Sequence, residues 1–343
     1  MTTSMSVRTW AVVIAASLIS APARVTEAAA GLGTVKHYRL PTSNTPHDVT
    51  DTLDGNVWFT VQGAFDPVTF LTPGSVARVT PRGDITEFAV CDFCITNDIV
   101  QGPDGILYIS DNDGQLRRIT TAGVVLSSIL IPDGSPIVGL AADSTSIWLA
   151  DSSNNRVGRF DIVSGAFTFY PVALNDGVDD VAVAGDGTVW FIGSGFTETG
   201  DIHVIGELDP DVGVVSMTPL SGVPAGIAVA PNGTVWATEI FADLIARLTP
   251  SASGPHAVVE FATAEGATPL GIAAAPDGNV WFTQNLRGNI ARITQDGVIT
   301  EASKAIDFAD PKRPDPIGIA IDTLGNPWYA ESLVDKVANL KLR

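Results

Sequence analysis

The feature that most restricts how this 343-residue chain can fold is a repeat that runs along almost its whole length. Two clear copies, VPAGIAVAPNGTVWATEIFADLIARLTP and TPLGIAAAPDGNVWFTQNLRGNIARITQDGVITEA, begin at Val223 and Thr268. Each unit carries one marker aromatic, and the markers recur at intervals of 40 to 50 residues: Trp58, Tyr108, Trp148, Trp190, Trp236, Trp281 and Trp328. Self-similarity with a period of this size is typical of propellers and solenoids. Seven markers therefore predict seven structural units.

Within a unit, apolar and polar residues alternate and turn residues interrupt the pattern. The clearest unit predicts strands over 271–275, 280–283, 289–294 and 298–301, with Asp-Gly turn signals at 277–278 and 296–297. Four short antiparallel strands in about 45 residues are typical of a β-propeller blade. The last unit ends with a strand over 337–342 and lacks a fourth strand, whereas an orphan strand over 34–40 precedes the first unit. We predict a single all-β domain over 34–343, a seven-bladed propeller closed by this N-terminal strand; an open solenoid is the alternative.

The first 23 residues have the features of a secretory signal. A short region ending at Arg8 precedes an apolar run over 10–19, and Ala21-Pro22-Ala23 offers a cleavage site. A cut after Ala30 and a retained membrane anchor are the alternatives, although the run of about ten residues is short for a bilayer that needs about 20. We expect a secreted or periplasmic protein.

The charge of the chain restricts its partners. Asp and Glu total 38 against 19 Lys and Arg, which gives a net charge of -19. The electric field of this negative charge repels phosphate backbones and anionic membranes. We therefore expect no nucleic-acid partner, and no membrane partner after signal cleavage. We expect a small-molecule or glycan ligand at the mouth of the channel, and a monomer.

Two positions in each unit are predicted to meet at one mouth of the central channel. The first is the pair just before the innermost strand: His47-Asp48, Asn97-Asp98, Val138-Gly139, Asp179-Asp180, Ala225-Gly226, Leu270-Gly271 and Ile317-Gly318. The second lies two or three residues after the marker aromatic: Val61, Asp111, Asp151, Gly193, Glu239, Gln284 and Glu331. Carboxylates from several blades would therefore crowd around one axis.

Crowded carboxylates repel one another unless they are protonated, hydrated or bound to a cation. One interpretation is a Mg²⁺ or Ca²⁺ site, because these ions take carboxylate and amide oxygens as ligands. Its predicted ligands from this pattern are Asp111, Asp151, Glu239 and Glu331, and the predicted ligand-binding rim is Asp48, Asn97, Asp98, Asp179, Asp180 and Gln284. The alternative is a hydrated acidic vestibule in which the aspartates of the first set cap strand starts and turns.

His47 is the only histidine in this set, and it lies beside Asp48. A histidine next to an acid can act as a general base or bind a metal, or it can be a polar rim residue without chemistry. Cys91 and Cys94 form a C-x-x-C motif between the first two units. Because we expect the protein to be exported to an oxidising compartment, we predict a local disulfide between them. The chain lacks the G-x-S-x-G, Walker and H-E-x-x-H motifs, which leaves serine-hydrolase, NTPase and zincin interpretations unsupported.

The phrases DGNVWFTQN, NIARITQDGVITE and NGTVWATE resemble the repeats of the virginiamycin B lyase, or streptogramin lyase, family. The resemblance covers all seven units, roughly residues 35–343. It implies a seven-bladed propeller that opens a cyclic depsipeptide antibiotic by elimination across its ester bond, assisted by Mg²⁺. The family pattern has a His after the Pro that opens the sixth repeat, a Glu-Pro-His opening the seventh, and a Glu soon after the seventh Trp.

This chain departs from that pattern at the histidines. The sixth-repeat position is Leu270 and the seventh repeat opens with Asp315-Pro316-Ile317, while the late acid survives as Glu331. The resemblance therefore implies a retained metal pair at Asp315 and Glu331, but leucine and isoleucine cannot take the proton next to a carbonyl.

We accordingly expect a metal-assisted lyase, or a hydrolase that opens a lactone or ester, whose substrate is not a streptogramin. His47 would supply a displaced base from the first blade. The alternative is a non-catalytic exported propeller that binds a protein, glycan or cation through the channel-mouth rim.

Overall fold

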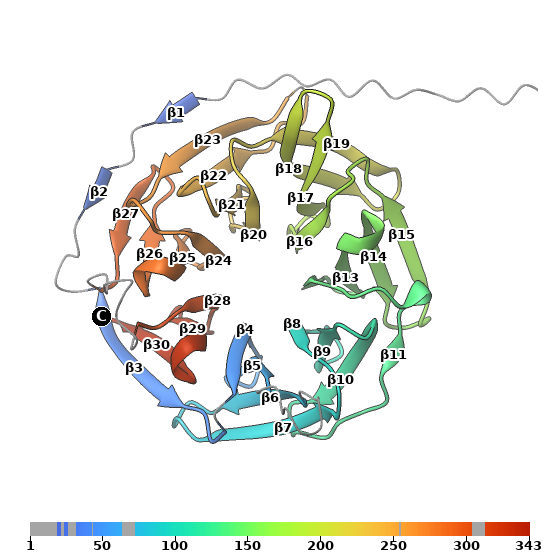
Figure 1. Ribbon diagram of the computed structural model, residues 1–343, viewed down its shortest axis with the longest axis vertical. Helices are drawn as coiled ribbons and strands as arrows, with labels where there is room; N and C mark the ends of the chain where they lie inside the picture. The colour runs from blue at the N-terminus through green and yellow to red at the C-terminus, as the bar shows by residue number, and fades with distance from the viewer. Residues whose placement is uncertain are drawn as a thin grey trace, which may run out of the picture.

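The computed structural model describes residues 19–21, 24–26, 32–42, 44–63, 73–253, 255–303 and 313–343. In these residues seven β-sheets stand in a ring around a central axis, without any α-helix (Figure 1). The predicted all-β, seven-bladed propeller is therefore confirmed. Within the described part of the chain, no helix is long and apolar enough to cross a membrane.

Each blade is a four-stranded antiparallel sheet whose first strand lies nearest the axis (Figure 1). Blade 1 consists of β4 (Thr45–Asp51), β5 (Val57–Gln62), β6 (Gly74–Val79) and β7 (Ile85–Cys91). Blade 2 consists of β8 (Thr96–Gln101), β9 (Ile106–Asp111), β10 (Gln115–Thr120) and β11 (Ile129–Leu130). Blade 3 consists of β12 (Gly139–Ala142), β13 (Ser146–Asp151), β14 (Arg156–Asp161) and β15 (Phe167–Pro171). Blade 4 consists of β16 (Gly177–Val183), β17 (Val189–Thr197), β18 (Gly200–Asp209) and β19 (Gly213–Pro219).

The remaining blades follow the same plan. Blade 5 consists of β20 (Pro224–Val229), β21 (Val235–Glu239), β22 (Leu244–Thr249) and β23 (Ala257–Ala262). Blade 6 consists of β24 (Pro269–Ala274), β25 (Val280–Gln284), β26 (Asn289–Ile293) and β27 (Val298–Glu301). Blade 7 consists of β28 (Pro316–Ile321), β29 (Pro327–Glu331), β30 (Lys336–Leu342) and β3 (Gly33–Arg39). Short 3-10 turns occur at η1 (Pro132–Gly134), η2 (Ser152–Asn154), η3 (Asn285–Arg287) and η4 (Ser332–Val334).

The N-terminal strand closes the ring as predicted. β3 pairs antiparallel with β30 and places His37 opposite Ala338, so the last blade takes its outer strand from the start of the chain. Two further short strands, β1 (Ile19–Ala21) and β2 (Arg24–Thr26), pair in parallel with the outer strands β23 and β27. The predicted signal peptide lies largely outside the described residues and stays a prediction.

The marker aromatics fill the spaces between blades. Trp236 of blade 5 lies in a cluster with Ile272 and Phe282 of blade 6, and Trp281 of blade 6 lies in a cluster with Tyr329 of blade 7. The other five markers pack against the next blade in the same way, with Trp328 of blade 7 closing onto blade 1. Truncation of a buried aromatic of this size costs about 3–5 kcal/mol, so the repeated marker explains why each blade needs its neighbours.

Candidate functional site

The mouth of the channel is built from a β-bulge that recurs in the innermost strands. Pairing between the first and second strands shifts register at Pro46/Val49, Thr96/Ile99, Val178/Asp180, Pro224/Gly226, Pro269/Ile272 and Pro316/Ile319. In these blades the predicted rim pairs therefore lie inside the innermost strand, at its bulge, rather than before it as we expected. A bulge leaves a residue without a ladder partner and redirects its side chain, which explains why this position can carry polar groups.

A threonine hydroxyl on the second strand fixes the bulge in blades 1, 5 and 6. Thr283 accepts a hydrogen bond from the Gly271 amide (2.9 Å) and donates one to the Ile317 carbonyl of the next blade (2.9 Å). Thr60 in blade 1 and Thr238 in blade 5 make the same pair of contacts. These hydroxyls join the bulges of blade 1 to blade 2, of blade 5 to blade 6 and of blade 6 to blade 7, and so hold the side chains that these bulges carry.

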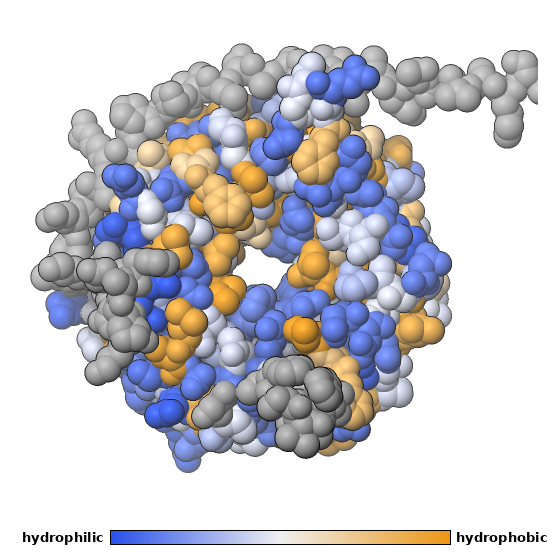
Figure 2. Space-filling view, viewed as in Figure 1, coloured by the Kyte–Doolittle hydropathy of each residue, from blue (hydrophilic) through white to orange (hydrophobic). Residues whose placement is uncertain are grey.

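Three aspartates occupy equivalent bulge positions and meet inside the channel, which is open at its centre (Figure 2). Each carboxylate accepts a backbone amide hydrogen of the next blade: Asp48 from Ile99, Asp98 from Leu140, and Asp180 from Ile227. Glycines at the same position in other blades leave room for them. A Cβ on Gly318 would lie 2.6 Å from an Asp48 carboxylate oxygen, and one on Gly139 would lie 2.5 Å from that of Asp180.

This gathering of acids changes their ionisation. Burial, followed by the charge of Asp48, a hydrogen bond with Asp48 and the charge of Asp180, raises the pKa of Asp98 well above its usual value. Burial, with smaller contributions from Asp48 and Asp179, raises the pKa of Asp180 to about 7. Burial and the charge of Asp176 raise the pKa of Asp179 to about 6. The channel therefore holds protons at neutral pH that isolated aspartates would release.

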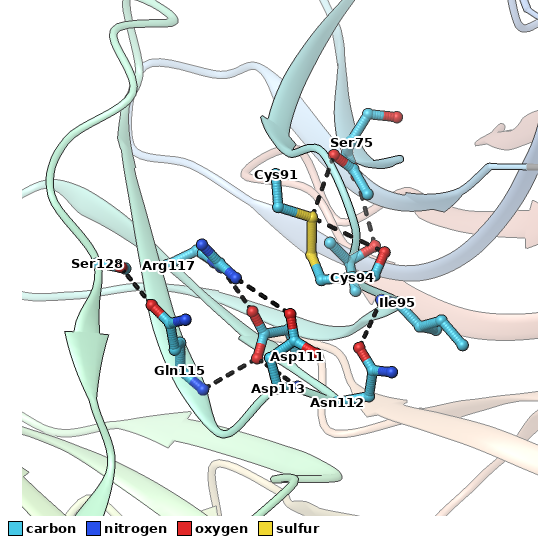
Figure 3. Close-up of polar contacts among 12 residues, drawn as sticks. Ser75, Cys91, Cys94, Ile95, Asp111, Asn112, Asp113, Gln115, Arg117 and Ser128 are labelled. Carbon is cyan, nitrogen blue, oxygen red and sulfur yellow. Dashed lines mark hydrogen bonds and ion pairs between the residues drawn. A yellow bond between two sulfur atoms is a disulfide. The ribbon is translucent and has the colours of Figure 1, made fainter. Parts of the chain in front are cut away.

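Asp111 and Asp151 of the second predicted set do not join this cluster, because each is bound by an arginine of its own blade. Asp111 contacts Arg117 at 2.5 Å, and Asp113 contacts the same arginine at 3.6 Å (Figure 3). Asp151 contacts Arg156 at 2.6 Å. Both acids that end these second strands are fully buried and fully paired, so their geometry is that of structural ion pairs.

In blades 5 and 6 the residue at the end of the second strand is not paired with an arginine in this way. Gln284 donates to Glu301, which is bound by Arg287 at 2.9 Å. Glu239 is fully buried without a cationic partner, and burial together with the charge of Glu260 raises its pKa to about 8. Within the described ranges, no three histidine, cysteine or carboxylate side chains are grouped as metal ligands.

The disulfide Cys91–Cys94 is present and joins the end of β7 to the segment before β8. Figure 3 shows it close to the Asp111–Arg117 pair. A surface depression of ≈ 450 Å³ beside it is lined by Phe93 and Arg117 among others, but Arg117 is already bound by acids there. The disulfide holds the chain where it enters the innermost strand of blade 2, whose Asn97 amide donates to the Ile137 carbonyl.

His47 lies at the bulge of blade 1, directly after Pro46. Its imidazole is half-buried, and its Nδ1 is buried without a hydrogen-bond partner among the described residues. A Cβ on Gly318 of blade 7 would lie 2.7 Å from the His47 carbonyl, just as one on Gly271 would lie 2.3 Å from the Ile317 carbonyl. His47 in blade 1, Leu270 in blade 6 and Ile317 in blade 7 are therefore equivalent positions on the ring.

Comparison with known proteins agrees with this architecture. The model of the virginiamycin B lyase family matches residues 24–210 and 186–343. The chain belongs to the virginiamycin B lyase family. A virginiamycin B lyase of Nocardia farcinica (strain IFM 10152) is 31% identical over 137 residues, which span 40% of this chain and 45% of that protein. The match thus covers less than half the length of this curated relative.

Solved structures of the virginiamycin B lyase family have the same fold. A streptogramin B lyase structure superposes with a TM-score of 0.74 at 22% identity over 90% of this chain and 98% of that one. A catalytically inactive variant of the Staphylococcus aureus virginiamycin B lyase with quinupristin superposes with a TM-score of 0.70 at 23% identity, over 90% of this chain and 99% of that one. At these identities the likeness establishes the fold alone.

The acid positions that virginiamycin B lyases share do not fit a Mg²⁺ site in this chain. Arg313 lies 3.3 Å from the Asp315 carboxylate, which also accepts a hydrogen bond from Ser332. Glu331 is buried and lies 2.9 Å from His37 Nδ1. The Asp315 carboxylate already faces a guanidinium, which makes it a poor ligand for a second positive charge, and without Asp315 the pair does not hold a metal ion. No step below is therefore assigned to a metal ion at this pair.

Sequence reasoning missed the partners of these acids. His37 lies on the closing strand, and its register opposite Ala338 carries it to Glu331. Arg313 lies outside every predicted strand, and its contact with Asp315 has no periodic signal. The register of the closing strand could have revealed the first contact, whereas only coordinates reveal the second.

Proposed function

We propose that this member of the virginiamycin B lyase family opens a cyclic ester at the channel mouth, with His47 as the base, on a substrate other than a streptogramin. The observation that carries the proposal is the place of His47 on the ring of bulges. Family members have histidines at this place in the sixth and seventh repeats, where this chain has Leu270 and Ile317. The base would thus reach the same mouth from the neighbouring blade.

The burial of His47 suits this role. Its Nδ1 is buried without a partner, and the ring is half-buried, so the remaining nitrogen is the one available to a ligand. His47 would take a proton from the carbon next to the one that bears the ester oxygen. The electrons of that C–H bond form a C=C bond, the C–O bond breaks and the carboxylate leaves, which opens the ring by elimination. If instead His47 activates a water molecule, the same ester is hydrolysed.

The surroundings of the mouth support an apolar, uncharged or cationic substrate. Antiparallel strands place the second-to-third strand connections at the same end as the bulges, and exposed apolar side chains lie in or beside these connections. Phe241 is 80% exposed, Leu333 61% and Phe196 53%. The net charge of -19 and the channel aspartates disfavour an anionic substrate. A cyclic ester with apolar substituents meets these conditions.

The test is a ring-opening assay with purified protein on a panel of macrocyclic lactones and cyclic depsipeptides, read by mass spectrometry. Elimination gives a linear product of unchanged mass, whereas hydrolysis adds one water. We expect His47→Gln to lower kcat by about 100-fold or more, which is the usual contribution of a general base. His256→Gln, which alters a histidine bound to Glu207 on blade 4, is the matched control and should keep turnover. Full turnover by His47→Gln would refute the assignment.

Non-catalytic binding through the same rim is the second candidate. The observation that favours it is that both family histidine positions are aliphatic while the family acids face Arg313 and His37. Tight binding of a panel member without conversion by the wild-type protein would support this candidate against the first.

We also propose that the protein is exported, secreted or periplasmic, because residues 1–23 carry the signal pattern. The disulfide Cys91–Cys94 supports an oxidising compartment. N-terminal sequencing of the protein recovered outside the cytoplasm tests this, and an intact Met1 on that material would contradict it.

A further inference from the structure

Blades 5 and 6 carry different charges at the same three register positions. In blade 6 these are Gln284 at the end of the second strand, Arg287 three residues later, and Glu301 opposite Ala291 on the outer strand. Arg287 contacts Glu301 at 2.9 Å, and Gln284 donates to the same carboxylate. One negative and one positive charge therefore neutralise each other in blade 6.

The equivalent positions in blade 5 are Glu239, Ala242 and Glu260, with Glu260 opposite Ala246. The neutral amide of blade 6 is replaced by a second carboxylate, and the arginine is replaced by alanine. Glu239 is 0% exposed and Glu260 7% exposed, so water screens neither charge well. Blade 5 buries two acids where blade 6 buries an ion pair.

The hydrogen bonds of the two acids leave one oxygen unsatisfied. Both Glu260 oxygens are occupied by Ser221, through its amide at 2.9 Å and its hydroxyl at 2.7 Å. Glu239 Oε2 accepts the Gly222 amide at 2.5 Å. Glu239 Oε1 is buried and has no hydrogen-bond partner among the described residues. A buried carboxylate oxygen without a partner is costly, so this place lacks a partner, which a cation could supply.

We propose that blade 5 binds a divalent cation between Glu239 and Glu260. Ca²⁺ and Mg²⁺ take carboxylate oxygens as their preferred ligands, and two carboxylates balance the charge of such an ion. Glu239 Oε1 supplies the open ligand position, and the cation takes the place that the guanidinium of Arg287 has in blade 6. This site lies within blade 5 and does not depend on His47 or on the proposed ring opening.

The experiment is thermal unfolding of the metal-stripped full-length protein, titrated separately with Ca²⁺ and with Mg²⁺, together with calorimetric titration. We expect at least one of the two ions to raise Tm in a saturable manner, because a ligand that binds only the native state stabilises it. Glu239→Gln keeps the shape of the side chain and should weaken that binding at least tenfold. Ala242→Arg recreates the blade 6 arrangement and should raise Tm in chelator while removing the response to the ion.

Glu301→Gln is the matched control, since it alters the equivalent acid of blade 6, which Arg287 already binds. It should leave the ion titration of Tm unchanged. The proposal is overturned if neither ion shifts Tm of the wild-type protein, or if Glu239→Gln responds as the wild type does. A higher Tm for Glu239→Gln without any ion response would identify a shared proton in place of the cation, which also overturns it.

Discussion

The channel aspartates predict an unusual dependence of stability on pH. Burial first, and then the neighbouring acids Asp48 and Asp179, raise the pKa of Asp180 from 3.8 to about 7. The folded state therefore holds a proton that the unfolded state releases at a lower pH. A carboxyl group whose pKa rises on folding lowers stability as the pH increases from its unfolded pKa to its folded pKa. For Asp180 this window extends from about pH 4 to pH 7.

The size of the effect follows from the width of the window. Between pH 5 and pH 7 the linkage amounts to about 3 kcal/mol, at about 1.4 kcal/mol per pH unit. Asp180 is half-buried in an open channel, so we reduce this to about 2 kcal/mol for screening by water. Asp180→Asn removes the titration and costs about 1 kcal/mol at every pH, because the amide can accept only with its oxygen.

The assay is urea unfolding of the wild type and Asp180→Asn at pH 5 and pH 8. We expect the wild type to lose about 2 kcal/mol more than the variant between these values. Asp186→Asn is the control, since hydrogen bonds to Thr188 lower the pKa of this exposed turn residue and it does not titrate in the window. Parallel pH profiles for the wild type and Asp180→Asn would refute the reasoning, because they would place Asp180 in contact with bulk water.

Three further substitutions test the ring itself by urea unfolding. Thr283→Val removes both hydrogen bonds of a buried hydroxyl and should cost about 2–3 kcal/mol, whereas Thr283→Ser should cost less than half of that. Arg156→Met leaves the buried Asp151 carboxylate without its cation and should cost about 3–5 kcal/mol, most of which Asp151→Asn in the same protein should restore. Gly318→Ala brings a Cβ to 2.7 Å from the backbone of blade 1 and should cost about 2 kcal/mol or more, while Gly185→Ala, which meets nothing within 4 Å, should stay within about 0.5 kcal/mol.

The fold could be predicted from the sequence because its determinants are periodic. The marker aromatics recur once per blade, and the predicted strand over 298–301 matches β27 as observed. The strand over 34–40 was recognised because the last blade lacked a partner, and it forms β3 (Gly33–Arg39). Each of these signals is local in sequence or repeats along it, so alignment of the units is enough to find it.

The candidate site could be predicted only in part, because its contacts join different blades. Alignment placed Asp48, Asp98 and Asp180 at equivalent positions, and they do meet in the channel. The same alignment placed Asp111 and Asp151 beside the axis, but their side chains turn to arginines in their own blades. Alternation tells which face of a strand a side chain occupies, whereas the partner it meets on that face depends on the third strand and its register.

The residues that give this chain the fold of its family differ from the residues at which the family reaction would take place. The ring is held by marker tryptophans and by hydroxyls such as Thr283, whose contacts do not involve the side chains at the bulges. The bulge residue can change from histidine to leucine or isoleucine without loss of these contacts, as Leu270 and Ile317 demonstrate. Blade 1 can equally carry His47 at the same position. Because the bulges of six blades lie at one end of the ring, a base can stand on different blades and still face the same mouth, which is the basis for our proposal that His47 takes this role.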